Sequence, residues 1–401
     1  MTLIKNVELA AGAAEVPFPA DILIADGRVQ SIIEANRARP PSADGTPSAD
    51  GTPETPASVV YDAKGAAALP GFIDTHTHGA AGVDVNYADP EGIRRLRLFY
   101  ASNGVTGFLP TLLTDSKENL ITAIKVLRAA MLDTSPGARI LGIHLEGPFL
   151  CAAYKGAMPE RLLQTPSIRD FEDYQAAAEG HIRRITISPE LPGAPELTAH
   201  AARSGTAVTI GHTGADYETA WRCINAGAAG TTHTFNAMKP LHHHTPGVVG
   251  ASLESDIFCE IICDGLHLHP GTVRLILKAK GFERVVAVTD SIMAAGLGDG
   301  KFKLGVNDIV VKDGDAVLAD LSARAGSTLT MAQALRNLCR FTGSSPHRVS
   351  RLLSRNPAEL IGLQARKGTL GIGMDADIVL LDKENRVSAV FVEGVLMDIQ
   401  R

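Results

Sequence analysis

The segment PGFIDTHTHG, residues 70–79, is an apolar run that ends in two histidines separated by one residue. Side chains at positions i and i+2 of a β-strand point to the same face. His76 and His78 can therefore point the same way from the end of one strand. The segment predicts a buried strand that carries two potential metal ligands at its tip.

Seven further apolar runs of the same kind follow, rich in Val, Ile and Thr. They are VTGFLPTLL (105–113), ARILGIHLEGPF (138–149), RRITISPE (183–190), TAVTIGHT (206–213), GTTHTFNAM (230–238), FCEIICDGLHL (258–268) and VVAVTDSI (285–292). Segments between them, such as 90–104 and 118–133, carry apolar residues at helical spacing. Eight strands that alternate with helices predict an α/β fold, a (β/α)8 TIM-like barrel.

The two ends of the chain differ from this central part. Residues 1–68 and 366–401 alternate in the manner of β-strands, with a turn at Asp26 and Gly27, and predict a small β-sandwich domain built from both ends. The catalytic barrel is assigned to residues 69–365, with a hairpin insertion near 301–320 that turns at Asp313 and Gly314. Residues 328–343 and 346–363 are predicted to be helices.

A polar segment interrupts the N-terminal part. PSADGT occurs twice in tandem, at 41–46 and 47–52, among Pro, Gly and Ser residues. Such a composition cannot bury enough apolar surface to order itself, so residues 37–58 are predicted to form a flexible loop without a function of its own.

The amino-acid composition limits the kinds of molecule that the protein is expected to bind. The formal net charge is −6 and Lys and Arg do not cluster in long runs, which argues against nucleic acid and against an anionic membrane surface. Charged residues interrupt the N-terminal segment, and no window reaches the roughly 18 to 20 apolar residues of a membrane span. Five scattered cysteines suit reduced thiols. We expect a cytoplasmic protein with a small-molecule partner.

In a (β/α)8 barrel the active site forms at the carboxyl ends of the strands. The residues at these ends are metal-ligand or proton-transfer types: His76, His78, Glu146, His212, His233, Asp264, His267 and Asp290. Taken singly, each has a structural explanation, such as a hydrogen-bonded core histidine, a solvated turn carboxylate or a helix N-cap.

The residues at the strand ends are more informative as a group. Four imidazoles and two carboxylates buried at one barrel end would leave charges unpaired without an ion, at a cost of several kcal/mol each. The group therefore predicts a divalent metal site. Imidazole and carboxylate ligands suit zinc, iron, manganese or cobalt.

The ordered motifs HTH, HLEGPF, GHT, THTFNAM, DGLH, VTDS, AGSTLTM and GMDADIVLLD resemble those of the N-acetylglucosamine-6-phosphate deacetylases, which belong to the amidohydrolase superfamily. The resemblance runs along nearly the whole chain. It implies metal-dependent hydrolysis of the acetamide of N-acetylglucosamine 6-phosphate to glucosamine 6-phosphate and acetate. It also implies a homodimer with a shared active site.

The resemblance implies roles for individual residues. Glu146, His212 and His233 match the principal metal ligands. His76 and His78 match a pair found in members that hold a second ion, and Asp290 completes that site. One or two ions per subunit are expected, with zinc as the first choice. Asp290 matches the catalytic acid/base and His267 the residue beside the scissile carbonyl. The positions that match substrate contacts are Asn236, Ala237, His244, His267, Ala157 and Met158.

Two of these positions depart from the family pattern. Met158 stands where the family has a histidine, and His244 where it has an arginine that contacts the substrate phosphate, often from the neighbouring subunit. Methionine has no hydrogen-bond donor, and histidine is only a partly charged substitute for arginine. An unphosphorylated or differently modified N-acyl amino sugar is therefore the alternative substrate, unless Lys155, Lys239 or His243 supplies the lost contact.

The sequence also bears on three other hypotheses. A cyclic amidase with a carbamylated lysine is disfavoured because Glu146 occupies the bridging place. A non-catalytic sugar-binding barrel predicts the loss of Asp290, Glu146, His212 or His233, and all four are present. The three consecutive histidines at 242–244 point in different directions, which favours a substrate-contacting loop over a metal site.

Overall fold

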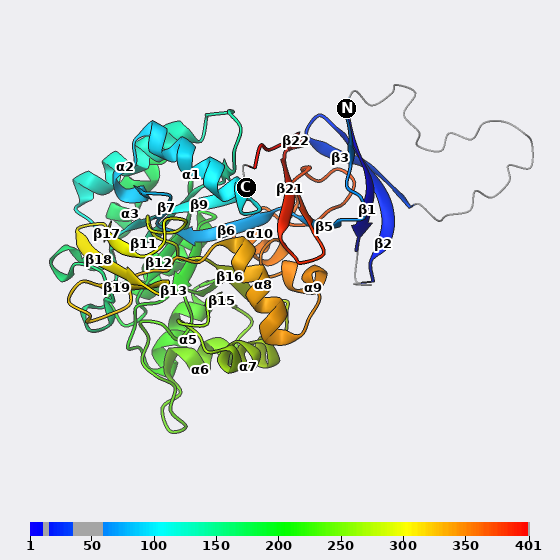
Figure 1. Cartoon of the computed structure of the whole chain (residues 1–401). Helices are drawn as coiled ribbons and strands as arrows, with labels where there is room; N and C mark the ends of the chain where they lie inside the picture. Colours follow the sequence, from blue (N-terminus) through cyan, green and yellow to red (C-terminus); the bar gives the residue numbers. More distant parts are fainter. Residues whose placement is uncertain (11–15, 35–58, 400–401) are drawn as a thin grey trace, which may run out of the picture.

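The computed structural model describes residues 1–10, 16–34 and 59–399 (Figure 1). The flexible loop predicted at 37–58, with its PSADGT repeat, lies outside the described residues. None of the helices within the described ranges combines the length and the hydropathy needed to cross a membrane.

Eight parallel strands form the barrel in the order of the sequence. They are β6 (Phe72–Thr77), β9 (Val105–Leu113), β11 (Ile143–Glu146), β12 (Ile182–Ile187), β13 (Ala207–Ile210), β14 (Gly230–Thr231), β15 (Phe258–Ile262) and β16 (Val285–Val288). Because these strands are buried on both faces, they are continuous apolar runs in the sequence. All eight coincide with the predicted runs, so the (β/α)8 barrel prediction is confirmed.

One helix follows each barrel strand and covers its outer side (Figure 1). These helices are α1 (Pro90–Ser102), α2 (Lys117–Ala130), α3 (Ile168–Ala177), α4 (Ala194–Arg203), α5 (Tyr217–Asn225), α6 (Gly247–Glu254), α7 (Pro270–Lys280) and α8 (Met331–Thr342). Short elements complete the loops: β7 (Gly79–Ala80), β8 (Val83–Asp84) and 3-10 turns at Val85–Tyr87, Ala152–Tyr154 and Glu160–Leu162.

The barrel closes between its first and last strands just beyond their carboxyl ends. The backbone N–H of Asp290 donates to the carbonyl of His76 at 2.9 Å, and that of His78 donates to the carbonyl of Ser291 at 2.8 Å. Closure therefore places Asp290 directly beside the two histidines of the first strand.

Two predicted elements are interrupted. The run 138–149 forms β10 (Arg139–Ile140) and β11, separated at Gly142, where a Cβ atom would lie 2.5 Å from Cγ of Arg183. The run 346–363 forms two short helices, α9 (Pro346–Ser350) and α10 (Arg355–Leu360), instead of one. Pro357 explains the second interruption because it fits the first turn of a helix but breaks a helix interior.

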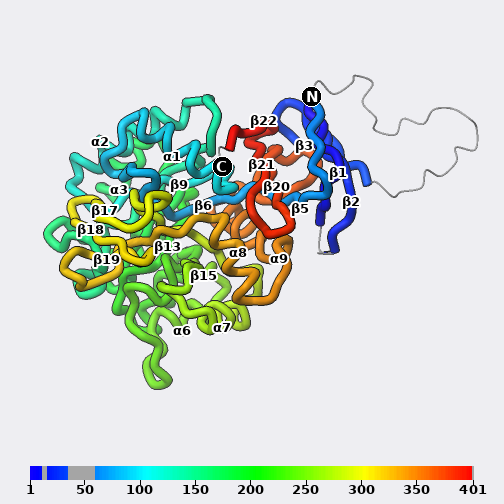
Figure 2. The backbone as a smooth tube through the Cα atoms, viewed as in Figure 1, coloured from blue at the N-terminus to red at the C-terminus, as the bar shows by residue number. Residues whose placement is uncertain are grey.

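A second sheet is built from both ends of the chain, as predicted (Figures 1 and 2). Its strands are β1 (Thr2–Leu9), β2 (Phe18–Ala25), β3 (Arg28–Glu34), β4 (Val59–Asp62), β5 (Ala67–Pro70), β20 (Ile378–Leu381), β21 (Val387–Val392) and β22 (Val395–Leu396). Strand β5 pairs with β20 and joins the two ends. The sheet folds over a shared apolar cluster that includes Ile22, Ile378 and Phe391.

The junction between this sheet and the barrel is short. Strand β5 ends at Pro70 and β6 begins at Phe72, so a single residue, Gly71, connects them. The domain limits assigned at 68/69 and 365/366 stay predictions.

A third, smaller sheet lies over the mouth of the barrel (Figure 1). It consists of the antiparallel strands β17 (Gly300–Leu304), β18 (Asn307–Lys312) and β19 (Asp315–Leu318), with a turn at Asp313 and Gly314. Its apolar face packs against residues of the barrel loops, among them Met158 and Ile292. This packing makes the small sheet one wall of the cavity described below.

Candidate metal centre and substrate cavity

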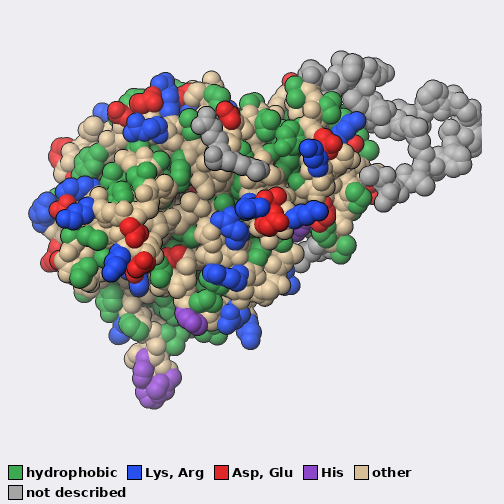
Figure 3. Space-filling view, viewed as in Figure 1, with side chains coloured by type: hydrophobic (Ala, Val, Ile, Leu, Met, Phe, Trp, Pro, Cys, Tyr) green, Lys and Arg blue, Asp and Glu red, His purple; other side chains and the backbone are tan. Residues whose placement is uncertain are grey.

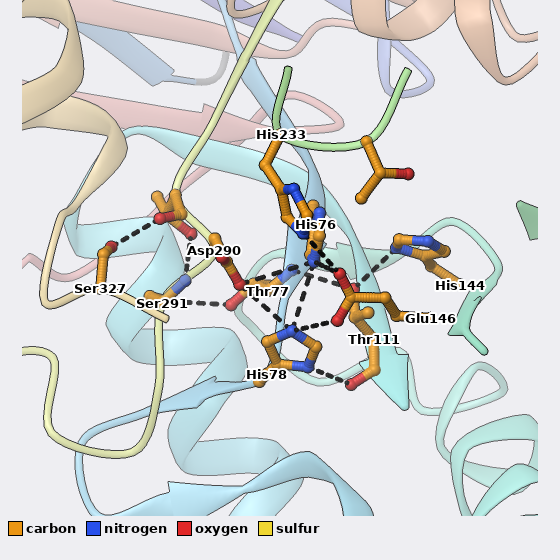
Figure 4. A network of polar contacts seen from close by, with 12 residues as sticks. His76, Thr77, His78, Thr111, His144, Glu146, His233, Asp290, Ser291 and Ser327 are labelled. Atoms are coloured by element: carbon orange, nitrogen blue, oxygen red, sulfur yellow. Dashed lines mark hydrogen bonds and ion pairs between the residues drawn. The ribbon is translucent and has the colours of Figure 1, made fainter. Parts of the chain in front are cut away.

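Six of the predicted site residues meet at the mouth of the barrel, all of them buried. They are His76, His78, Glu146, His212, His233 and Asp290, of which all but His212 are labelled in Figure 4. The last two histidines and the aspartate each lie two residues beyond the end of a strand and have positive φ angles of 49°, 29° and 50°. The left-handed backbone is rare for such residues and is concentrated at functional sites.

Glu146 lies between two pairs of histidines. Its Oε1 atom is 3.2 Å from Nε2 of His212 and 3.0 Å from Nε2 of His233. The same oxygen is 3.4 Å from Nε2 of His76, and Oε2 is 3.2 Å from Nε2 of His78. The described residues thus contain two groups of potential metal ligands that share Glu146, each with its ligand atoms within 4.8 Å of one another.

Asp290 completes the side of the cluster formed by His76 and His78. Its Oδ1 atom lies 3.5 Å from Nε2 of His76 and 3.2 Å from Nε2 of His78 (Figure 4). This contact follows from the closure of the barrel, which fixes the backbones of the three residues together.

Each of the four imidazoles is held at Nδ1 by an oxygen atom. His76 contacts Glu260 at 2.8 Å, and His78, His212 and His233 contact the backbone carbonyls of Thr111, Tyr154 and Asn236 at 3.0 to 3.1 Å. Because a carbonyl only accepts hydrogen bonds, Nδ1 carries the proton and the lone pair of Nε2 faces the cluster. Metal-binding histidines are held in the same way, with the ring nitrogen that does not face the metal donating to an oxygen.

The facing lone pairs and carboxylates require a positive charge between them. The Nε2 atoms of His212 and His233 are only 3.1 Å apart, and those of His76 and His78 3.3 Å apart. Burial alone would lower the pKa of His78, but Asp290 and Glu146 raise it to about 9. The cluster therefore attracts either protons or a metal ion, and its imidazole and carboxylate donors fit a divalent transition metal.

Sequence reasoning missed the group that supports this cluster from below. Glu260 on β15 accepts a hydrogen bond at Oε1 from Nδ1 of His76 and another from the backbone N–H of His233, at 2.8 and 2.9 Å. Its Oε2 atom forms a close ion pair with Arg184 of β12, which is fully buried. Burial would raise the pKa of Glu260, but attraction to Arg184 and His76 lowers it to about 2.

Both Glu260 and Arg184 could have been noticed in the sequence, because each is a charged residue inside an apolar run. Glu260 interrupts FCEIIC and Arg184 interrupts RRITI, although strands of this type are buried on both faces. A buried charge is stable only with a partner, so one charge of each sign among the barrel runs could have indicated a pair.

A cavity of about 410 Å³ opens above the metal-ligand cluster. Of the predicted residues, Ala157, Met158, Asn236, Ala237 and His267 line it, together with five of the six cluster residues. Nδ1 of His267 lies 2.6 Å from Oδ2 of Asp264, whose Oδ1 accepts two backbone N–H groups. Asp264 therefore fixes the ring of His267 at the cavity wall.

The structure does not bring His244 to this cavity. His244 lies on an exposed hairpin between β14 and α6, whose tip projects away from the barrel with histidine side chains gathered on it (Figures 1 and 3). The rings of His243 and His244 stack there with their centroids 3.9 Å apart. His244 is not among the described residues that line the cavity, so this chain by itself does not provide the predicted contact with substrate.

Comparison with known proteins agrees with this architecture. Residues 67–397 match the amidohydrolase family. The chain belongs to the amidohydrolase family and, within it, to the N-acetylglucosamine-6-phosphate deacetylases. The Bacillus subtilis protein of that name is 35% identical over 337 residues, which cover 83% of this chain and 85% of that protein. An Escherichia coli O157:H7 protein named N-acetylgalactosamine-6-phosphate deacetylase is 34% identical, with 82% of this chain and 86% of that protein covered.

The structure of this chain also superposes on solved structures of N-acetylglucosamine-6-phosphate deacetylases. A mutant of the Mycobacterium smegmatis N-acetyl-D-glucosamine-6-phosphate deacetylase, in complex with N-acetyl-D-glucosamine 6-phosphate, superposes with a TM-score of 0.87 at 31% identity, covering 99% of both chains. The N-acetylglucosamine-6-phosphate deacetylase of Thermotoga maritima has a TM-score of 0.85 at 31% identity, again over 99% of both chains.

The role of Glu260 generates the first prediction. Glu260→Gln keeps the volume of the side chain but removes the charge that holds His76 and balances Arg184. Metal affinity, measured by competition with a chelator, should fall about 10- to 100-fold, the usual effect of losing such an outer partner. Glu384→Gln, at an exposed carboxylate, is the control. A folded Glu260→Gln protein with wild-type metal affinity would contradict the role.

Proposed function

We propose that this chain hydrolyses the acetamide of N-acetylglucosamine 6-phosphate and releases glucosamine 6-phosphate and acetate. The observation that carries the proposal is the placement of Asp290 and His267 in one cavity with the metal-ligand cluster. The names of the relatives and of the liganded Mycobacterium smegmatis structure support the choice of substrate. The relatives' names include both N-acetylglucosamine 6-phosphate and its epimer N-acetylgalactosamine 6-phosphate. Glucosamine and galactosamine derivatives are therefore the two candidates.

The cluster would hold one or two divalent ions, for which zinc is our first choice and iron, manganese and cobalt the alternatives. Glu146, His212 and His233 would hold one ion, and His76, His78 and Asp290 a second, with Glu146 shared. A bound divalent ion activates water at neutral pH and polarises the acyl carbonyl.

Asp290 is placed to move the proton that hydrolysis requires. Burial would raise its pKa, but His76 and His78 hold the pKa below its ordinary value, so the carboxylate is available as a base. Its Oδ1 atom contacts those histidines, while Oδ2 has no hydrogen-bond partner among the described residues. Oδ2 would take a proton from the attacking water and return it to the amine nitrogen, which cannot leave as an anion.

His267 would bind the acyl oxygen. Nδ1 of His267 donates to Asp264, and a doubly protonated ring would donate a second hydrogen bond, from Nε2, to the oxygen on which negative charge develops. Asn236 and Ala237, at the cavity wall beside His233, would contact the sugar.

A second candidate substrate is an unphosphorylated N-acyl amino sugar. Met158 favours it, because this side chain is buried in the apolar cluster below the small third sheet and offers no donor to a phosphate.

We also propose that the protein is a homodimer in which the projecting hairpin brings His244 to the partner's cavity. The support is the exposure of the hairpin tip and its direction away from the barrel (Figure 3). A cytoplasmic location stays a proposal, supported by the five scattered cysteines.

An acetate-release assay tests the substrate. Purified protein is given N-acetylglucosamine, its 6-phosphate and N-acetylgalactosamine 6-phosphate, and acetate and free amine are both quantified. We expect equimolar products and a kcat/KM that is at least about 10-fold higher with a 6-phosphate, since a charge-assisted contact adds roughly 1.5 to 3 kcal/mol. Equal values with and without the phosphate would support the unphosphorylated substrate instead.

Asp290→Asn tests the acid/base role. The variant keeps the shape of the side chain but cannot accept the proton, so kcat should fall by about 10²- to 10⁴-fold. Asp308→Asn, at a carboxylate exposed on the small third sheet, should leave kcat unchanged. Wild-type kcat in Asp290→Asn would exclude the assigned role.

Removal of metal tests the cluster itself. Dialysis against a chelator should abolish acetate release and lower the melting temperature, because the native state loses a tightly bound ligand. Zinc, added back in steps, should restore both and reveal whether one or two equivalents are needed. A chelated protein with unchanged activity and melting temperature would show that no ion is held.

A further inference from the structure

The described residues that line the cavity include one arginine. The cavity wall on the side of the small third sheet is apolar, with Leu113, Met158 and Leu304. Among the described residues that line the cavity, Arg324 is the only lysine or arginine. Lys155 and Lys239, the substitutes considered from the sequence, are absent from that lining.

The backbone of Arg324 is fixed on two sides. Arg324 pairs with Val317 of β19, and the flanking residues 323 and 325 exchange backbone hydrogen bonds of 2.9 and 3.0 Å with the same strand. Three residues further on, the N–H of Ser327 donates to the carbonyl of Asp290 at 2.7 Å. The loop is therefore anchored both to the small third sheet and to the proposed catalytic aspartate.

The guanidinium group is also oriented. Nε and Nη2 of Arg324 donate to Oδ1 and Oδ2 of Asp315 at 2.8 and 2.9 Å. This two-point contact fixes the plane of the group, while Nη1 has no hydrogen-bond partner among the described residues. The side chain is 44% exposed, so these remaining donors are accessible to a ligand in the cavity.

A phosphate that enters this cavity needs a cationic partner. Glu146 and Asp290 place two carboxylates at the deep end, and the apolar wall offers no donors. An unpaired charge removed from water costs several kcal/mol. The planar guanidinium matches the geometry of phosphate oxygens better than any other side chain does.

We propose that Arg324, oriented by Asp315, binds the 6-phosphate of the substrate and thereby sets the preference for a phosphorylated amino sugar. This inference rests on the proposed function and adds the residue that selects the substrate. It assigns phosphate recognition to a residue of the same subunit as the metal-ligand cluster. The two departures from the family pattern, Met158 and His244, are then compatible with a phosphorylated substrate.

Paired kinetics test the inference. Arg324→Met should lower kcat/KM for N-acetylglucosamine 6-phosphate about 10- to 100-fold, mainly through KM, as the loss of a charge-assisted contact predicts. The value for unphosphorylated N-acetylglucosamine should stay within about twofold. Arg324→Lys should recover part of the loss, because it restores the charge without the planar geometry. Arg386→Met, at an exposed arginine that also pairs with an aspartate but lies outside the cavity lining, is the matched control and should change neither value.

Equal losses on both sugars would show that Arg324 only supports the loop, and no loss on the phosphorylated sugar would exclude the contact. A loss of the same size in Arg386→Met would assign the effect to the overall electrostatic field of the protein. Each of these results overturns the inference.

Binding separates this inference from the proposed function. Calorimetric titration with glucosamine 6-phosphate and with glucosamine measures recognition without hydrolysis. If the wild type binds the phosphorylated sugar but releases no acetate, the proposed function fails; weaker binding by Arg324→Met and Arg324→Lys would still support the contact. If the wild type binds both sugars equally, or neither, the inference is overturned.

Discussion

The structure depends on one electrostatic constraint at the mouth of the barrel. Four imidazole lone pairs and two carboxylates converge on a buried space with Glu146 at its centre, and they are stable there only with positive charge between them. Glu260 and Arg184 form a buried ion pair one layer below the cluster. The Glu260 carboxylate also accepts hydrogen bonds from Nδ1 of His76 and from the backbone N–H of His233. Barrel closure and metal-ligand geometry are thus parts of the same network.

The two ends of the cavity are built differently. The deep end is polar and fixed by strand termini, which suits a reaction that requires ligands and a proton acceptor at set positions. The outer end is formed by the small third sheet and the loop after it, with an apolar wall and one oriented guanidinium. On the roles proposed for these residues, chemistry and substrate choice are carried by different elements, and the second can vary without disturbing the first.

The barrel and the residues that meet at its mouth could be predicted from sequence because each strand is a buried apolar run and each of these residues stands at the end of one. The residues that support these side chains from other strands and loops could not be predicted from the positions of the apolar runs. Glu260 is a single charge within an apolar run, and its pairing with Arg184 appears only when β12 and β15 face each other across the barrel. Arg324 lies in a loop of small residues, and only the folding of β17 to β19 over the mouth brings it to the cavity. The position of His244 depends on the direction of a hairpin, which local sequence does not determine.

The most direct test of the central constraint is the position of bound metal. Crystals of protein purified without chelators can be measured at the absorption edges of zinc, iron, manganese and cobalt, and anomalous maps calculated. We predict a peak within bonding distance of Glu146, His212 and His233, with or without a second peak beside His76, His78 and Asp290. Anomalous maps with no peak at the cluster, from protein that releases acetate, would contradict the account.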